Sequence, residues 1–272
     1  MPDRPAPSVY RTAVVRTERL GPHMVRVVVT GEGLDAYPDS GFSDRYAKLI
    51  FPRPGVAYPE DMDAAEIRAT LPPEQWPAYR TYTIRRIDHT AAELTIDVVT
   101  HGGEGVAAPW AEAAQPGDEL VLTGPGGAYV PSPEVDHHLL AGDASALPAI
   151  AASLEVLPEG ATATVVIQVH GPEDEVPLPT PGFAEVSWVY GDDPDDLAAA
   201  VRALALPPVR IQAFVHGELH AVRSLRGHLV TERGIAREDL SLSGYWRRGK
   251  DEDGFQAEKR ELSAADTAAG AT

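Results

Sequence analysis

The chain has 272 residues, no cysteine and a formal net charge of -18, with an isoelectric point of about 4.8. A surface this acidic argues against nucleic acid or an anionic membrane as a binding partner. Without cysteine there is no disulfide, no thiolate nucleophile and no cysteine-ligated iron–sulfur cluster. No apolar run reaches the ~20 residues that span a bilayer, and the first residues lack a signal-peptide pattern, so we expect a cytoplasmic protein.

The first half of the chain predicts short strands separated by glycine and proline turns. We expect strands at 9–17, 24–30, 46–51, 79–86, 94–99 and 118–123, because these runs are rich in β-branched residues or alternate between apolar and polar side chains. Residues 52–77 form a proline-rich stretch with one short helical candidate at 63–69, and such long connections are usually functional or disordered. Repeated short strands favour a small antiparallel barrel.

The second half changes to an alternation of strands and helices. Strands are expected at 138–141, 164–169, 186–190, 209–215 and 240–243, with helices from about 148 to 157, at 194–204 and at 221–231. This alternation indicates βαβ units and a parallel sheet. We therefore expect two domains, a barrel over residues 1–131 and an α/β domain over residues 132–272.

One stretch of the first domain concentrates groups that bind ligands. It reads Arg80-Thr81-Tyr82-Thr83-Ile84-Arg85, and in an extended strand Arg80, Tyr82 and Ile84 share one face. An arginine fork fits a phosphate, a phenol ring can stack on a flat cofactor, and a threonine can hydrogen-bond a ring nitrogen. Taken alone, these six residues are explained better as a polar edge strand.

Three further motifs accompany Arg80-x-Tyr82-Thr83-x-Arg85. They are His101-Gly102-Gly103-Glu104-Gly105-Val106-Ala107-Ala108-Pro109-Trp110, Gly142-Asp143-Ala144-Ser145-Ala146-Leu147-Pro148-Ala149-Ile150 and Gly244-Tyr245-Trp246-Arg247-Arg248-Gly249. In this order, the four motifs resemble those of the siderophore-interacting proteins, a branch of the ferredoxin-reductase-like flavoenzymes. Val106 replaces a proline of the family pattern, and Ala144 replaces a usual glutamate. The resemblance implies a six-stranded antiparallel FAD-binding barrel followed by an α/β nucleotide-binding domain with a parallel sheet.

The resemblance also implies roles for individual residues. Arg80 and Arg85 would hold the flavin pyrophosphate, Tyr82 would lie against the isoalloxazine, and Thr83 would lie near its N5 atom. The other cofactor-binding candidates come from the remaining three motifs: His101, Gly102, Gly105, Val106, Ala107, Trp110, Gly142, Asp143, Ser145, Ala146 and Trp246. Asp143 and Ser145 fit a plain helix N-cap equally well. Because the cofactor carries the electrons, no side chain is assigned as a catalytic acid or base, or as a metal ligand.

The implied reaction passes electrons from NADH or NADPH through FAD to Fe(III) held by a siderophore. Hard oxygen donors favour the ferric ion, so reduction to Fe(II) loosens the chelate. The acidic run at 170–175 would repel a 2′-phosphate and favours NADH, while no Gly-x-Gly-x-x-Gly fingerprint follows a predicted strand. Ferredoxin is an alternative donor.

An anionic ferric siderophore requires a local basic patch on so acidic a protein. The candidates are Lys48, Arg247, Arg248 and Lys250, although 247–250 is also explained as a simple cationic turn. Two rival functions stay open: a flavin reductase with another acceptor, such as flavodoxin, ferredoxin or a quinone, and a non-catalytic protein that sequesters a ferric chelate or flavin. We expect a monomer.

Overall fold

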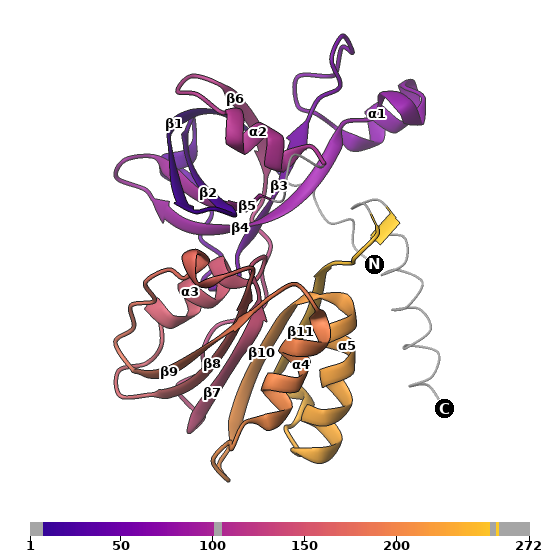
Figure 1. Ribbon diagram of the computed structural model, residues 1–272. Helices are drawn as coiled ribbons and strands as arrows, with labels where there is room; N and C mark the ends of the chain where they lie inside the picture. Colours follow the sequence, from indigo (N-terminus) through magenta and orange to yellow (C-terminus); the bar gives the residue numbers. More distant parts are fainter. Residues whose placement is uncertain (1–7, 101–104, 251–253, 256–272) are drawn as a thin grey trace.

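The computed structural model describes residues 8–100, 105–250 and 254–255. They form a closed barrel and, below it in Figure 1, a five-stranded sheet covered by helices. This arrangement confirms the predicted fold class. Within the described ranges, no helix has the length and hydropathy needed to cross a bilayer.

The barrel contains β1 (Val9–Gly21), β2 (Met24–Thr30), β3 (Tyr46–Phe51), β4 (Ala78–Asp88), β5 (Glu93–Val99) and β6 (Glu119–Thr123). Neighbouring strands are antiparallel and close in the order β1-β2-β5-β4-β3-β6. Alternate positions such as Val27, Leu49 and Ile96 point inward and are almost completely buried, which is the pattern expected of a small filled barrel. The helix α2 (Ala107–Ala113) packs Ala111 against the same core.

The proline-rich connection between β3 and β4 has a small core of its own. Its helix α1 (Ala64–Thr70) begins at Asp63, whose carboxylate accepts the backbone N–H groups of Ala65 and Glu66. Ile67 packs with Ile50 and Val121 on the outer face of the barrel. The connection is therefore ordered, and the helix predicted at 63–69 is confirmed within one residue.

The second part of the chain contains β7 (His137–Asp143), β8 (Thr162–Val169), β9 (Phe183–Tyr190), β10 (Ile211–Glu218) and β11 (Leu240–Trp246). These strands are parallel and lie in the order β11-β10-β7-β8-β9. The helix α3 (Leu147–Glu155) covers one face, whereas α4 (Pro194–Ala203) and α5 (Leu219–Gly227) cover the other. Both faces are buried, so the central strands read as continuous apolar runs.

The strand order reverses between β7 and β10, and ligands of open α/β sheets bind at such a reversal, outside the carboxyl ends of the strands. Here those ends are Asp143 and Glu218. The remaining helical turns are short: 3-10 turns at Leu34–Ala36, Pro73–Gln75, Pro172–Asp174 and Arg237–Asp239, and a π turn at His228–Glu232 that follows α5.

The structure extends several predicted elements. β1 runs four residues further than expected, β7 reaches Asp143, and β11 includes Tyr245 and Trp246. The predicted helix at 221–231 is α5 followed by the π turn, and α2 was not predicted. β4 has a β-bulge between Ile84 and Arg86, where it contains one residue more than the paired part of β5.

Candidate functional site

The face of β4 that points into the barrel carries the first residues predicted to bind a cofactor. Arg80 lies opposite Leu49 of β3, and Tyr82 lies opposite Ala47, so the predicted grouping of Arg80, Tyr82 and Ile84 on one face is confirmed. The partly buried guanidinium of Arg80 donates to the carbonyl of Tyr79 at 2.8 Å and, among the described residues, pairs with no carboxylate. Most of its N–H donors are therefore available to an anionic ligand.

Two aromatic rings pack against the barrel core. Tyr82 and Trp110 are both partly buried against the barrel core, and the Trp110 ring lies 5.8 Å from the ring of Phe51. Gly105, with a φ of 79°, leads into α2, and Val106 is the residue at which the helix begins. Ala107 is buried, so its side chain packs inside the protein. The candidates His101 and Gly102 lie outside the described residues.

Thr83 connects β4 to the end of β11. Its side chain is buried and hydrogen-bonded with Tyr245, which comes from the other part of the chain. Burial raises the pKa of Tyr245 far above its ordinary value, and the neighbouring carboxylates of Asp44 and Asp143 add to this shift. Sequence reasoning missed Tyr245, although it stands within the Gly244-Tyr245-Trp246 motif.

Asp143 joins the ends of three strands. Its Oδ1 accepts the Ser145 backbone N–H at 2.9 Å and the Ser145 hydroxyl at 2.5 Å, while Oδ2 accepts the Glu218 N–H at 2.7 Å and the Trp246 indole N–H at 2.8 Å. Burial raises the pKa of Asp143, and these four hydrogen bonds oppose the shift. Each carboxylate oxygen of Asp143 already accepts hydrogen bonds from two donors. One of these donors is the indole of Trp246, which is 39% exposed, so Asp143 fixes the orientation of that ring.

The alternative that Asp143 or Ser145 is a plain helix N-cap is wrong. The helix α3 begins at Ala146, which makes no side-chain cap, and the bond from Ser145 N–H to Asp143 closes a turn just before the helix. A Cβ on Gly142 would lie 2.5 Å from the Cβ of Ala146 and 2.5 Å from the carbonyl of His216. Ala146 is fully buried, so its side chain is not available to a ligand.

The carboxyl edge of the sheet is acidic. Glu218 caps α5 through the backbone N–H of Ala221 at 3.2 Å and also accepts the Arg248 N–H at 3.3 Å. The Arg248 guanidinium donates to the carbonyl of Asp192, at the end of β9. The same Asp192 pairs with His170 at 3.1 Å and raises the pKa of that histidine.

The structure places the basic candidates on two elements. Lys48 is exposed on β3, with Nζ 3.4 Å from the hydroxyl of Thr81 and no carboxylate partner among the described residues. The segment 247–250 forms a turn directly after β11, closed by the bond from Lys250 N–H to the Arg247 carbonyl. Thus 247–250 is a cationic turn, which both interpretations of this segment allow, and Arg248 reaches across the sheet edge.

A second residue near Lys48 was missed by sequence reasoning. Tyr46 lies two residues before Lys48 on the same face of β3, is 39% exposed and stands opposite Thr83. A Cβ on Gly126 would lie 2.2 Å from the Tyr46 ring, so only glycine leaves room for that ring. Tyr46, Thr83 and Tyr245 therefore mark the place where β3, β4 and β11 meet.

Arg85 lies away from this place. Its two terminal nitrogens bind the two carboxylate oxygens of Glu155, the last residue of α3, and this pairing lowers the pKa of Glu155. Both residues line a groove of about 510 Å³ together with Arg16, Glu18, Arg26, Val28, Arg86 and Thr95. Arg80 does not line this groove, and it donates to the Tyr79 carbonyl instead.

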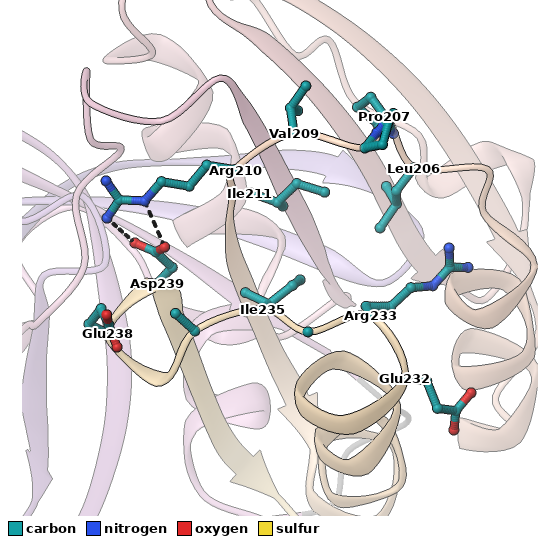
Figure 2. Close-up of a pocket in the computed structure, with 13 residues that line it drawn as sticks. Leu206, Pro207, Val209, Arg210, Ile211, Glu232, Arg233, Ile235, Glu238 and Asp239 are labelled. Carbon is teal, nitrogen blue, oxygen red and sulfur yellow. Dashed lines mark hydrogen bonds and ion pairs between the residues drawn. The ribbon is translucent and has the colours of Figure 1, made fainter.

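Another hollow, of about 550 Å³, lies at the opposite edge of the sheet, where β10 and β11 begin (Figure 2). Arg210 and Asp239 form a two-pronged ion pair beside it, with N···O distances of 2.9 and 2.8 Å. None of the residues predicted to bind a ligand lines this hollow.

Comparison with protein families identifies the chain. A profile described as the siderophore-interacting FAD-binding domain matches residues 13–129, and one described as siderophore-interacting protein matches residues 135–249. The chain belongs to the siderophore-interacting protein family. This finding confirms the resemblance on which the sequence-based prediction rested.

Relatives of known name align along most of their length. Ferric vibriobactin reductase ViuB of Vibrio cholerae is 34% identical over 250 residues, covering 90% of this chain and 92% of the relative. The NADPH-dependent ferric-chelate reductase of Escherichia coli is 30% identical over 238 residues, covering 86% and 91%. An uncharacterized protein of Mycobacterium tuberculosis is 44% identical over 275 residues, covering 93% and 95%.

Solved structures agree with this family. The siderophore-interacting protein SipS of Aeromonas hydrophila superposes with a TM-score of 0.81 at 30% identity, covering 96% of this chain and all of that one. The ferredoxin reductase of carbazole 1,9a-dioxygenase superposes with a TM-score of 0.60 at 14% identity, covering 87% of this chain and 67% of that one. The latter likeness shows the shared ferredoxin-reductase-like fold alone.

Proposed function

We propose that this siderophore-interacting protein is a flavin-dependent ferric-siderophore reductase, which uses electrons from NADH or NADPH to reduce chelated Fe(III). The observation that carries the proposal is the partly buried Arg80, which has no carboxylate partner among the described residues and shares a barrel face with Tyr82. A guanidinium in an FAD-binding barrel that has no carboxylate partner can bind a pyrophosphate. Its relatives include proteins named as ferric vibriobactin reductase and ferric-chelate reductase.

The residues of the barrel face fit FAD. Arg80 offers charged donors to phosphate, and Tyr82 and Trp110 offer flat apolar surfaces that exclude water from a ring system. Thr83 lies on the opposite face of β4, where its hydroxyl meets Tyr245, and Asp143 holds the Trp246 indole by its N–H. When it is bound, FAD supplies the exchange between a two-electron hydride donor and a one-electron acceptor. The roles of His101, Gly102, Gly105 and Val106 stay predictions.

The nicotinamide donor is proposed to bind at the reversal of strand order between β7 and β10. Gly142 and Ser145 offer backbone there, since Asp143 is fully used in holding Ser145, Glu218 and Trp246. The acidic run 170–175 favours NADH, whose ribose carries no 2′-phosphate. The Escherichia coli relative is named as NADPH-dependent, so both donors belong to the proposal.

The proposed substrate is a ferric siderophore with anionic character. Lys48 would attract it, and the cationic turn 247–250 begins two residues after Tyr245, which contacts Thr83 of β4. Each hydride carries two electrons and each ferric ion accepts one, so oxidation of one nicotinamide reduces two iron ions. The siderophore's oxygen donors hold Fe(II) more weakly, which releases the iron.

Further parts of the proposal concern the protein as a whole. We place the division between its two domains at residues 131 and 132, and we propose that it acts as a monomer in the cytoplasm, where NADH and NADPH are available. Reduced ferredoxin is the alternative electron donor. Size-exclusion chromatography with light scattering and cell fractionation test the oligomeric state and the location.

The decisive experiment combines a spectrum with an assay. Protein reconstituted with FAD should be yellow, should oxidise NADH or NADPH only in the presence of a ferric chelate, and should yield two Fe(II) per nicotinamide, measured with a ferrous chelator. Protein that binds the chelate without turnover would instead support sequestration. Turnover with flavodoxin, ferredoxin or a quinone, but not with ferric chelates, would support a reductase with another acceptor.

A further inference from the structure

The strand β4 presents two residues to the α/β part of the chain. Thr83 and Arg85 share the face opposite to Arg80 and Tyr82, as expected for alternate positions of a strand. Thr83 meets Tyr245 at the end of β11, and Arg85 meets Glu155 at the end of α3. One strand of the barrel is therefore held at two points by two different elements of the other domain.

The contact between Arg85 and Glu155 has the geometry of a strong ion pair. It is bidentate, and the Arg85 side chain is only 12% exposed while that of Glu155 is 41% exposed. The guanidinium also lies at the carboxyl end of α3, where the helix dipole favours a cation. Two residues earlier on the helix, the fully buried Ser153 hydroxyl bonds with the hydroxyl of Ser43 at 2.8 Å.

The surroundings of Arg85 do not suit a phosphate ligand. Both of its terminal nitrogens are already bound to Glu155, and a pyrophosphate would have to displace that carboxylate. In the same groove, Arg26 is paired with Asp97 at 2.7 Å and Arg16 with Glu93 at 3.0 Å. The groove therefore contains guanidinium groups whose charges are compensated by carboxylates of the chain itself.

We propose that Arg85 is a positioning residue, which acts through Glu155 as a clasp between the barrel and the α/β domain. The clasp sets the distance between the carboxyl edge of the sheet and the Arg80–Tyr82 face of the barrel. This inference rests on the proposed function, in which a nicotinamide donor at the sheet edge must reach a flavin at the barrel. It replaces a cofactor-binding role for Arg85.

The test uses Arg85→Met, Glu155→Gln, the double variant and the charge-reversed pair R85E/E155R in the full chain. Because the chain has no cysteine, T90C and R226C place two spin labels at exposed sites, one in each domain, and their distance distribution reports the domain arrangement. The other readouts are the Kd for FAD, from titration of the apoprotein, and the stopped-flow rate of flavin reduction by NADH.

The clasp predicts that each single variant broadens the distance distribution and slows flavin reduction about fivefold, while the Kd for FAD changes less than about twofold. The double variant should be no worse than the single ones, because coupled residues are not additive. The charge-reversed pair should recover a narrow distribution and at least part of the rate. As a control, R11M/E119Q breaks a similar arginine–glutamate pair within the barrel and should change none of the three readouts.

Three results would overturn the inference. A rise of tenfold or more in the Kd for FAD in Arg85→Met, absent in Glu155→Gln, would make Arg85 a cofactor ligand. Additive effects in the double variant, or an unchanged distance distribution, would show that the pair does not hold the domains. If the protein bound no FAD at all, the proposed function would fail, but the spin-label distances would still test the clasp.

Discussion

Replacement of Arg80 by methionine tests the barrel face most directly. The substitution keeps much of the aliphatic stem that lies along β4 and removes the guanidinium, whose only hydrogen bond in the described part of the chain is to the Tyr79 carbonyl. A charge-assisted hydrogen bond contributes about 1.5–3 kcal/mol. If the partly buried Arg80 holds a phosphate, the Kd for FAD should therefore rise about 10- to 150-fold in Arg80→Met.

The assay is a titration of apoprotein with FAD, followed by the quenching of flavin fluorescence. Arg86→Met is the matched control, because Arg86 stands on the same strand, is exposed and has its nearest carboxylate, that of Asp88, at 3.8 Å. The control should change the Kd less than about twofold. An Arg80→Met protein with a nearly unchanged Kd for FAD would refute the reasoning. An equal rise of the Kd in Arg86→Met would also refute it, because both arginines would then act only by long-range attraction of the phosphates.

Three further predictions concern the substrate, the sheet edge and the acid range. Lys48→Ala should raise the KM for an anionic ferric siderophore about two- to fivefold, as an exposed ion pair does, and a slowed flavin reduction with unchanged KM would contradict its role. Trp246→Phe removes one hydrogen bond to the buried Asp143 carboxylate, so urea unfolding should show a loss of about 1.5–3 kcal/mol, and equal stability would disprove that anchoring. Burial lowers the pKa of His138 to about 4 in the folded protein, so between pH ~6.5 and 4 the unfolded chain binds a proton that the folded chain does not. The free energy of unfolding should therefore fall by about 3 kcal/mol as the pH is lowered through that window. In urea titrations, His138→Gln should show a weaker dependence of the free energy of unfolding on pH.

Much of the fold follows from local patterns. Alternation in residues such as Leu94, Ile96 and Val98 predicts a half-buried strand, and the structure has β5 there. Errors concentrate at element ends: β1 continues through exposed residues such as Glu18 and Arg19 because they pair with β2. A polar strand end has no periodic pattern of its own, since its stability comes from the neighbouring strand.

Part of the candidate site could likewise be predicted from the sequence, and part of it could not. The sharing of one face by Arg80, Tyr82 and Ile84 follows from the period of an extended strand, and the sequence motifs alone indicated the family. Sequence reasoning missed Tyr46 and Tyr245, because the residues around each tyrosine in the sequence do not indicate which residues it contacts in the fold. Their meeting at Thr83 appears only in the folded chain.

The amino-acid sequence by itself determined which side chains share a face and to which family the motifs belong. Only the tertiary structure decided which groups these side chains meet. Asp143 receives hydrogen bonds from residues 75 and 103 positions away, and Arg85 binds a carboxylate 70 positions away. Periodicity acts over a few neighbouring residues, whereas the partner of a buried charge is selected by the packing of two domains that the chain brings together only when it folds.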